Sequence, residues 1–156
     1  MAAALLTLTA LSIAGIAASF VLAFRDGATS HVGIAIFATM LNLLAHSFMM
    51  FYLIGKGKAV REAASEGGLQ GDYYRRVARL RAPVFSRATL AMGVLMAAAI
   101  LGASVDVGVL SPVPHAALAA CAFAAQMYTF ITEVKALTGT ARVVDEVNHA
   151  LSMPDR

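Results

Sequence analysis

Residues 31 to 55 form an uncharged apolar run that constrains the fold of this chain more than any other stretch. As an α-helix rising about 1.5 Å per residue, the run reaches roughly 36 Å, and the hydrocarbon core of a bilayer is about 30 Å thick. We therefore expect this run to span a membrane. Three more apolar runs, at about 2–24, 86–104 and 115–137, each approach the roughly 20 residues that a spanning helix needs.

The composition also places the chain in a bilayer. Hydrophobic residues make up 60% and charged residues 13% of the chain, whereas about a quarter of the residues in soluble globular domains are charged. The sequence predicts an all-α fold, a four-helix transmembrane bundle in which residues 1–156 form a single integral membrane domain. The single cysteine, Cys121, excludes a disulfide within the chain and any multi-cysteine metal site, and we expect no metal centre of that kind.

The first run is predicted to be a retained helix. Its leading residues, MAAALL, lack Lys and Arg, and its apolar core is longer than the 7 to 15 residues typical of a signal peptide.

Basic residues predict the orientation of the spans. Arg25 is alone between the first and second spans, whereas eight basic residues lie between the second and third. By the positive-inside rule, both termini and segments 56–85 and 138–156 are expected in the cytoplasm, with the protein in the inner (plasma) membrane. The eight are Lys56, Lys58, Arg61, Arg75, Arg76, Arg79, Arg81 and Arg87.

Helical patterns continue beyond the apolar runs. Good helix formers extend the second helix to a break at Gly67-Gly68, and an apolar period extends the fourth helix past Gly139. Residues 71–82 place Tyr73, Val77 and Leu80 on one helical face and basic side chains around the rest, which favours a basic interfacial helix on the inner leaflet, with Pro83 opening the third helix. Its basic side chains are expected to meet lipid headgroups or an acidic partner: Arg75, Arg76, Arg79 and Arg81. No nucleic-acid motif accompanies them, so we expect no nucleic-acid partner.

Two polar stripes interrupt the apolar helices. Thr39, Asn42 and His46 share one face of the second helix, because they stand at i, i+3 and i+7. Gln126, Thr129 and Glu133 share one face of the fourth helix. Matching the depths of the two helices makes either a His46–Glu133 or a His46–Tyr128 contact feasible. An ionisable group inside a span is a functional candidate, and a hydrogen bond that only joins helices is the alternative.

The histidines also make a b-type haem a candidate cofactor, because facing helices can ligate iron with His–His or His–Met pairs. His31 and His115 are expected at the same outer depth, and His46 at a depth similar to that of Met96 on the third helix.

The stretch HSFMMFYLIGKGKAVREA, together with the order of the spans, resembles uncharacterised four-helix bacterial inner-membrane proteins. This resemblance implies the topology and brings no activity, cofactor or site residue with it.

The function favoured by these patterns is that of a non-catalytic subunit packing into a larger membrane protein complex or a homo-oligomer. The outer loops are too short for a domain, and small residues on the first and third helices allow close helix packing. The alternatives are electron transfer through haem or quinone near His46, and transport of protons or a small solute along the two stripes of an oligomer. No Ser–His–Asp spacing, glycine-rich phosphate loop or Cys–His pairing favours nucleophilic catalysis.

Overall fold

A computed structural model describes residues 1–25 and 28–152 of the chain. Within these ranges it has four helices and no strands, which confirms the all-α prediction: α1 (Ala2–Arg25), α2 (Ala28–Glu66), α3 (Tyr73–Asp106) and α4 (Pro112–Ser152). All four are long and apolar enough to cross a membrane, as expected of a multi-pass membrane protein. Residues 26–27, between α1 and α2, lie outside the described residues, as do residues 153–156.

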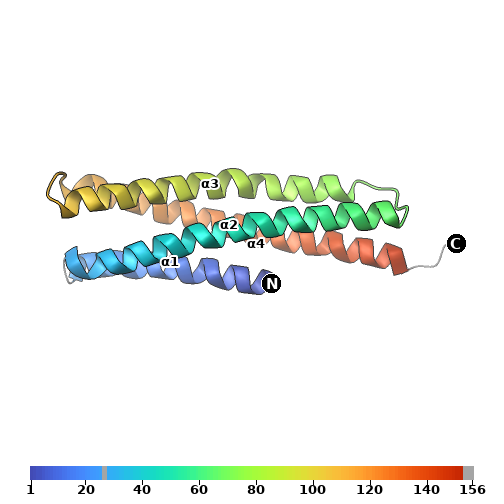
Figure 1. Cartoon of the computed structure of the whole chain (residues 1–156), viewed down its shortest axis with the longest axis horizontal. Coiled ribbons are helices and arrows are strands. Elements are labelled where there is room, and N and C mark those ends of the chain that lie inside the picture. Colours follow the sequence, from blue (N-terminus) through green and yellow to red (C-terminus); the bar gives the residue numbers. More distant parts are fainter. Residues whose placement is uncertain (26–27, 153–156) are drawn as a thin grey trace.

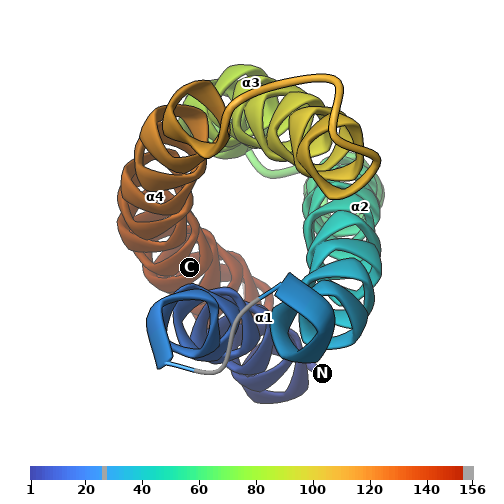
Figure 2. The same ribbon diagram turned by 90° about the vertical axis from the view of Figure 1, so that its left-hand side faces the viewer.

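The helices pair as two hairpins. α1 packs along α2 and α3 along α4, while α2 also packs against α3, and both α1 and α2 contact α4. The hairpins lie apart at the end where α3 turns into α4, and they come together toward the opposite end (Figure 1). Viewed from the end where they lie apart, the four helices form a ring (Figure 2). We call this end of the bundle the outer end.

Helices α2, α3 and α4 continue beyond the start of α1. Ala2, Leu5 and Leu6 of α1 pack at the level of Met49 and Leu53 of α2, so α1 begins part-way along the bundle, and α2, α3 and α4 extend past it (Figure 1). We call the extension, residues 56–66, 73–85 and 138–152, the stalk. The stalk has its own buried apolar cluster, formed by Val60, Val77, Val143 and Val147.

The expected separate interfacial helix at 71–82 is wrong. Residues 73–82 and the third span form one continuous helix, with Pro83 inside it. The apolar face that we expected to enter lipid packs in the stalk instead, where Val77 is fully buried against α2 and α4. Proline removes one backbone hydrogen bond from a helix interior, and the packing of Val77 and Val84 on either side of Pro83 holds the helix together.

Glycines end two helices. The Gly68 N–H donates to the Ser65 carbonyl and the Leu69 N–H to the Ala64 carbonyl, the pair of bonds that closes a helix when the residue after it has a positive φ. Gly68 has that φ, 61°. Gly108, with φ 76°, ends α3 in the same way. The break predicted at Gly67-Gly68 is thus confirmed, and α4 continues through Gly139 as expected.

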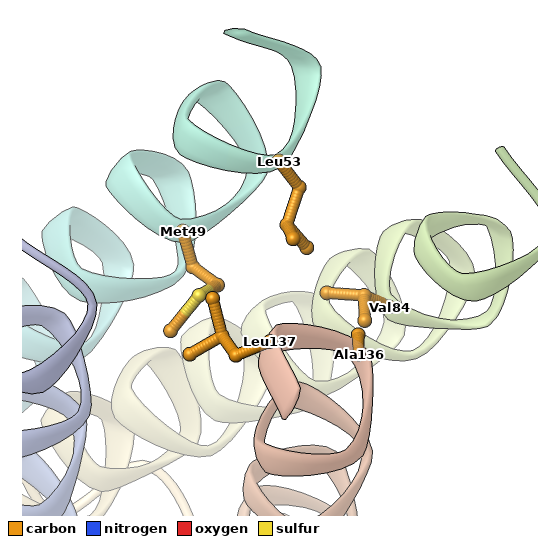
Figure 3. Close-up of a cluster of buried hydrophobic side chains, with 5 residues drawn as sticks. All are labelled: Met49, Leu53, Val84, Ala136 and Leu137. Carbon is orange, nitrogen blue, oxygen red and sulfur yellow. The ribbon is translucent and has the colours of Figure 1, made fainter. Parts of the chain in front are cut away.

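A cluster of apolar side chains fastens the two hairpins where the stalk begins. Figure 3 shows Met49 and Leu53 of α2 pointing toward Val84 of α3 and toward Ala136 and Leu137 of α4. Met49, Leu53 and Val84 are fully buried. Alanine at the crossing lets the helices approach closely, and the longer side chains fill the space on either side of it.

The close packing of α1 on α2 at Gly15 generates a prediction. A Cβ atom added at Gly15 would lie 2.9 Å from the Ala38 Cβ. Gly15→Ala should therefore lower stability in detergent, because overpacking costs about 1–3 kcal/mol and exceeds the gain of up to about 1 kcal/mol in helix propensity. Gly33→Ala is the matched control, because nothing lies within 4 Å of the added Cβ. Circular dichroism melting measures the effect, and equal losses in the two variants would contradict the packing.

Candidate functional site: a buried hydrogen-bond network

His46 lies at the centre of a hydrogen-bond network that joins three helices. Its Nδ1 is 2.6 Å from Glu133 Oε1 and its Nε2 is 2.7 Å from Gln126 Oε1. Gln126 Nε2 in turn donates to the Ala91 carbonyl of α3, at 3.1 Å. The side chains of His46, Gln126 and Glu133, which we call the His46 network, are completely buried.

The sequence spacing explains this arrangement. Gln126 and Glu133 stand seven residues, or about two turns, apart on α4, so they lie on the same face. The imidazole of His46 reaches between them from α2 and offers one nitrogen to each. A slip of α2 along α4 by one turn, about 5.4 Å, would break both bonds. The His46 network therefore fixes the register of the two hairpins.

The donors and acceptors in the His46 network determine which atoms carry hydrogen. The Gln126 amide nitrogen donates to a carbonyl, so its oxygen faces His46 and can only accept. The Nε2 of His46 must then carry a hydrogen. One further proton is shared between Nδ1 and Glu133, because a bond between them needs one donor. Wherever that proton lies, His46 and Glu133 together carry no net charge, which limits the cost of burying them in a bilayer.

A second polar contact joins α1 to α2. The Asn42 Nδ2 donates to the Ser12 Oγ at 3.0 Å, and the Ser12 hydroxyl donates to the Thr9 carbonyl at 2.7 Å. All three side chains are completely buried. Ser12 and Thr9 were not among the predicted site residues, although their spacing of three on α1 could have placed them on one face.

Three buried side-chain oxygen atoms have no hydrogen-bond partner among the described residues. Two belong to the polar contacts just described, Oε2 of Glu133 and Oδ1 of Asn42, and the third is Oγ1 of Thr140 in the stalk. A buried acceptor without a partner is costly, and in proteins such an atom commonly binds a water molecule or takes part in function.

Only some residues of the two predicted polar stripes form hydrogen bonds between helices. Of the two partners considered for His46, the structure brings Glu133 to it, while Tyr128 is 56% exposed. The Arg87 guanidinium lies 4.4 Å from the centre of the Tyr128 ring and donates to the Thr132 hydroxyl at 2.6 Å. Thr129 is buried and bonds within its own helix, to the Ala125 carbonyl. Thr39 is half-buried and is not among the hydrogen-bond partners of His46 or Gln126.

The four candidate haem ligands separate into two cases. Both ring nitrogens of His46 are held by protein side chains, so neither offers iron a free lone pair. Met96 is 49% exposed on the outside of α3, and the geometry gives a His46–Met96 pair no support. The rings of His31 and His115, by contrast, do meet, with 6.5 Å between their centroids.

The basic side chains expected at the membrane surface largely bond within the stalk. Arg76 binds Glu146 through both nitrogens, with 2.8 Å between Nη2 and Oε1. This pair holds the pKa of the Glu146 carboxyl below its usual value and raises the pKa of Arg76. Arg79 pairs with Asp72 at 2.8 Å, and Arg81 donates to the Tyr74 hydroxyl at 3.3 Å. Arg75 is exposed.

Substitution of His46 separates a structural from a chemical role. His46→Leu removes a partner from both Gln126 and Glu133, and should cost about 0.6–2 kcal/mol for the interhelical hydrogen bonds lost in a membrane. His46→Gln should recover much of this, because an amide can both donate and accept. Thermal stability and assembly of the two variants measure the difference. If both variants match the unsubstituted protein, His46 does not organise the bundle.

Comparison of the chain with models of protein families, with curated proteins and with solved structures finds no match. A function can therefore be inferred only from the chemistry and packing of the residues themselves.

Proposed function

We propose that this protein is a non-catalytic integral membrane subunit that packs into a larger membrane protein complex or a homo-oligomer. The stalk is the observation that carries the proposal. Three helices continue beyond α1 around a core of their own, and the α4 part of the stalk alone extends roughly 22 Å. A rigid helical projection of this kind suits contact with another protein.

The closed interior supports a non-catalytic role. His46, Gln126 and Glu133 bond to one another and to the backbone, and Asn42 bonds to Ser12. Two shallow depressions lie on or beside the stalk, one lined by residues that include Tyr73 and Glu146 and one by residues that include Ile54 and Phe85. No residue of the His46 network lines either depression. The polar groups therefore serve helix joining better than they serve a substrate.

The outer face of α1 supports association. Ala10, Ala14 and Ala18 are all exposed and stand four residues apart, so they form one row of small side chains. On α3, Thr89 and Gly93 are exposed with the same spacing. Rows of small residues let helix backbones approach closely in a membrane, where packing rather than hydrophobicity drives association.

We further propose that both termini and the stalk lie in the cytoplasm, with the protein in the inner (plasma) membrane and exposed arginines such as Arg75 near anionic lipid headgroups or an acidic partner. The excess of Lys and Arg at the stalk end supports this orientation. A cysteine at position 109 should react with an impermeant reagent from outside, and one at position 65 should not. Reaction at position 109 from the cytoplasmic side alone would reverse the orientation.

The oligomer is the most accessible part of the proposal to test. In mild detergent the protein should give a particle well above the 16.2 kDa of one protomer. Ala14→Leu should reduce the particle mass by blocking close approach along the α1 row, whereas Ala23→Leu, nine residues further along and also exposed, should not. Light scattering during size exclusion measures the mass. A strict monomer with an enzymatic turnover would contradict the proposal.

The two alternatives gain little from the geometry. Transport along the stripes requires a continuous polar path, whereas Thr129 bonds to its own helix and His46 is closed in by Gln126 and Glu133. Electron transfer through haem at His46 lacks a free ring nitrogen. His31 and His115 at the outer end differ from His46, because their rings are not both held by hydrogen bonds to protein side chains.

A further inference from the structure

His31 and His115 bridge the two hairpins where these are farthest apart. His31 lies in the first turns of α2, and His115 lies in the first turn of α4. The hairpins that contain them separate toward this outer end (Figure 1), yet the two imidazole rings are neighbours, with 6.5 Å between their centroids and 36° between their planes. The polar contacts described above do not include either ring.

A hydrogen bond to the backbone orients the ring of His115. Its Nδ1 lies 3.0 Å from the Ala98 carbonyl, which can only accept, so Nδ1 carries the hydrogen. In a neutral imidazole the lone pair is then on Nε2, and a histidine that donates to a backbone carbonyl in this way is typical of metal sites. Gly102 makes room for the ring, because a Cβ atom there would lie 2.9 Å from the His115 Cε1.

The ring of His31 has a nitrogen without a hydrogen-bond partner among the described residues. This atom, Nδ1, is buried. The neighbouring backbone is anchored, since the Ser19 hydroxyl donates to the His31 carbonyl at 3.4 Å. A buried imidazole nitrogen without a partner is costly in an apolar surrounding, and a ligand shared with His115 would give this ring a bonding partner.

The distance between the ring centroids can be compared with the distances expected for two imidazoles bound to one metal. With metal–nitrogen bonds of about 2.0 Å and about 1.1 Å from nitrogen to ring centre, two imidazoles on opposite sides of a metal have centroids roughly 6.2 Å apart, and at a tetrahedral angle about 5 Å apart. The observed 6.5 Å is closer to the opposed arrangement than to the tetrahedral one. A tetrahedral zinc site would also need more ligands, and the described residues contain no group of three or more His, Cys, Asp or Glu that could hold a metal.

We propose that His31 and His115 bind one metal centre on its opposite sides. Two such centres exist: the iron of a haem, whose axial ligands are opposed, and Cu(I) in linear coordination. Both take two neutral imidazole nitrogens, so the protein chemistry is shared. This site goes beyond a subunit role, which needs no metal, and an oligomer that lacks the metal would leave the proposed function intact.

The test begins with protein purified in mild detergent from haem-replete, copper-supplemented cells. An absorption spectrum reports haem, elemental analysis reports copper, and titration with Cu(I) against a chelator measures the affinity of metal-free protein. A Soret band at about one haem per protomer supports haem iron, and copper at about one per protomer supports Cu(I). Absence of both, together with no binding of added haem or Cu(I), overturns the proposal.

Variants assign the site. His31→Phe and His115→Phe should each lower affinity by at least about 100-fold, and Gly102→Ala by about 10- to 100-fold through displacement of the His115 ring. His149→Phe is the matched control, because His149 is exposed on the stalk, and it should bind normally. His115→Gln keeps a donor for the Ala98 carbonyl, and its melting temperature without metal shows whether the fold is intact. Undiminished metal binding by the His31 and His115 variants overturns the assignment.

Discussion

The two hydrogen bonds of His46 determine how the hairpins of this protein meet. Lipid offers no hydrogen-bond partner, so a histidine, a glutamine and a glutamate inside the apolar helices are satisfied only in the register that brings them together. Apolar packing alone specifies register weakly, because many slips of one helix along another bury similar side chains. The His46 network removes that ambiguity for α2 and α4, and the Gln126 bond to the Ala91 carbonyl extends it to α3.

The rest of the architecture follows from where that junction lies. On one side of it, the cluster around Met49 and Leu53 and the stalk hold α2, α3 and α4 together. On the other side, the hairpins separate, and Asn42 bonds α2 to α1 rather than across the bundle. A small apolar cluster, Leu95 and Ala98 of α3 with Ala122 of α4, still contacts Ile16 of α1 on this side. Nearer the end of the bundle, the rings of His31 and His115 meet between the hairpins.

The sequence predicted the features that a single helix encodes. An uncharged run identifies a span, and the spacing of Asn42 and His46 identifies a buried face, because both signals depend only on helix geometry. Features set by two helices together were harder to predict. The one-sided apolar pattern at 71–82 is the same whether its apolar side meets lipid or Val60 and Val143, so it predicts an interfacial helix where the structure has the stalk. Ser12 by itself indicates only a small packing residue, because nothing local shows that Asn42 would face it.

A double-mutant cycle between His46 and Glu133 measures whether their hydrogen bond joins the hairpins. Unfolding free energies in mixed micelles would be measured for His46→Leu, Glu133→Leu and the double variant. If the bond joins the hairpins, the double variant should lose less than the sum of the single losses, by about 0.6–2 kcal/mol. A His46–Thr129 cycle with Thr129→Val is the control and should be additive within about 0.5 kcal/mol, since the Thr129 hydroxyl bonds within α4. Additive losses at His46 and Glu133 would contradict the role assigned to this bond.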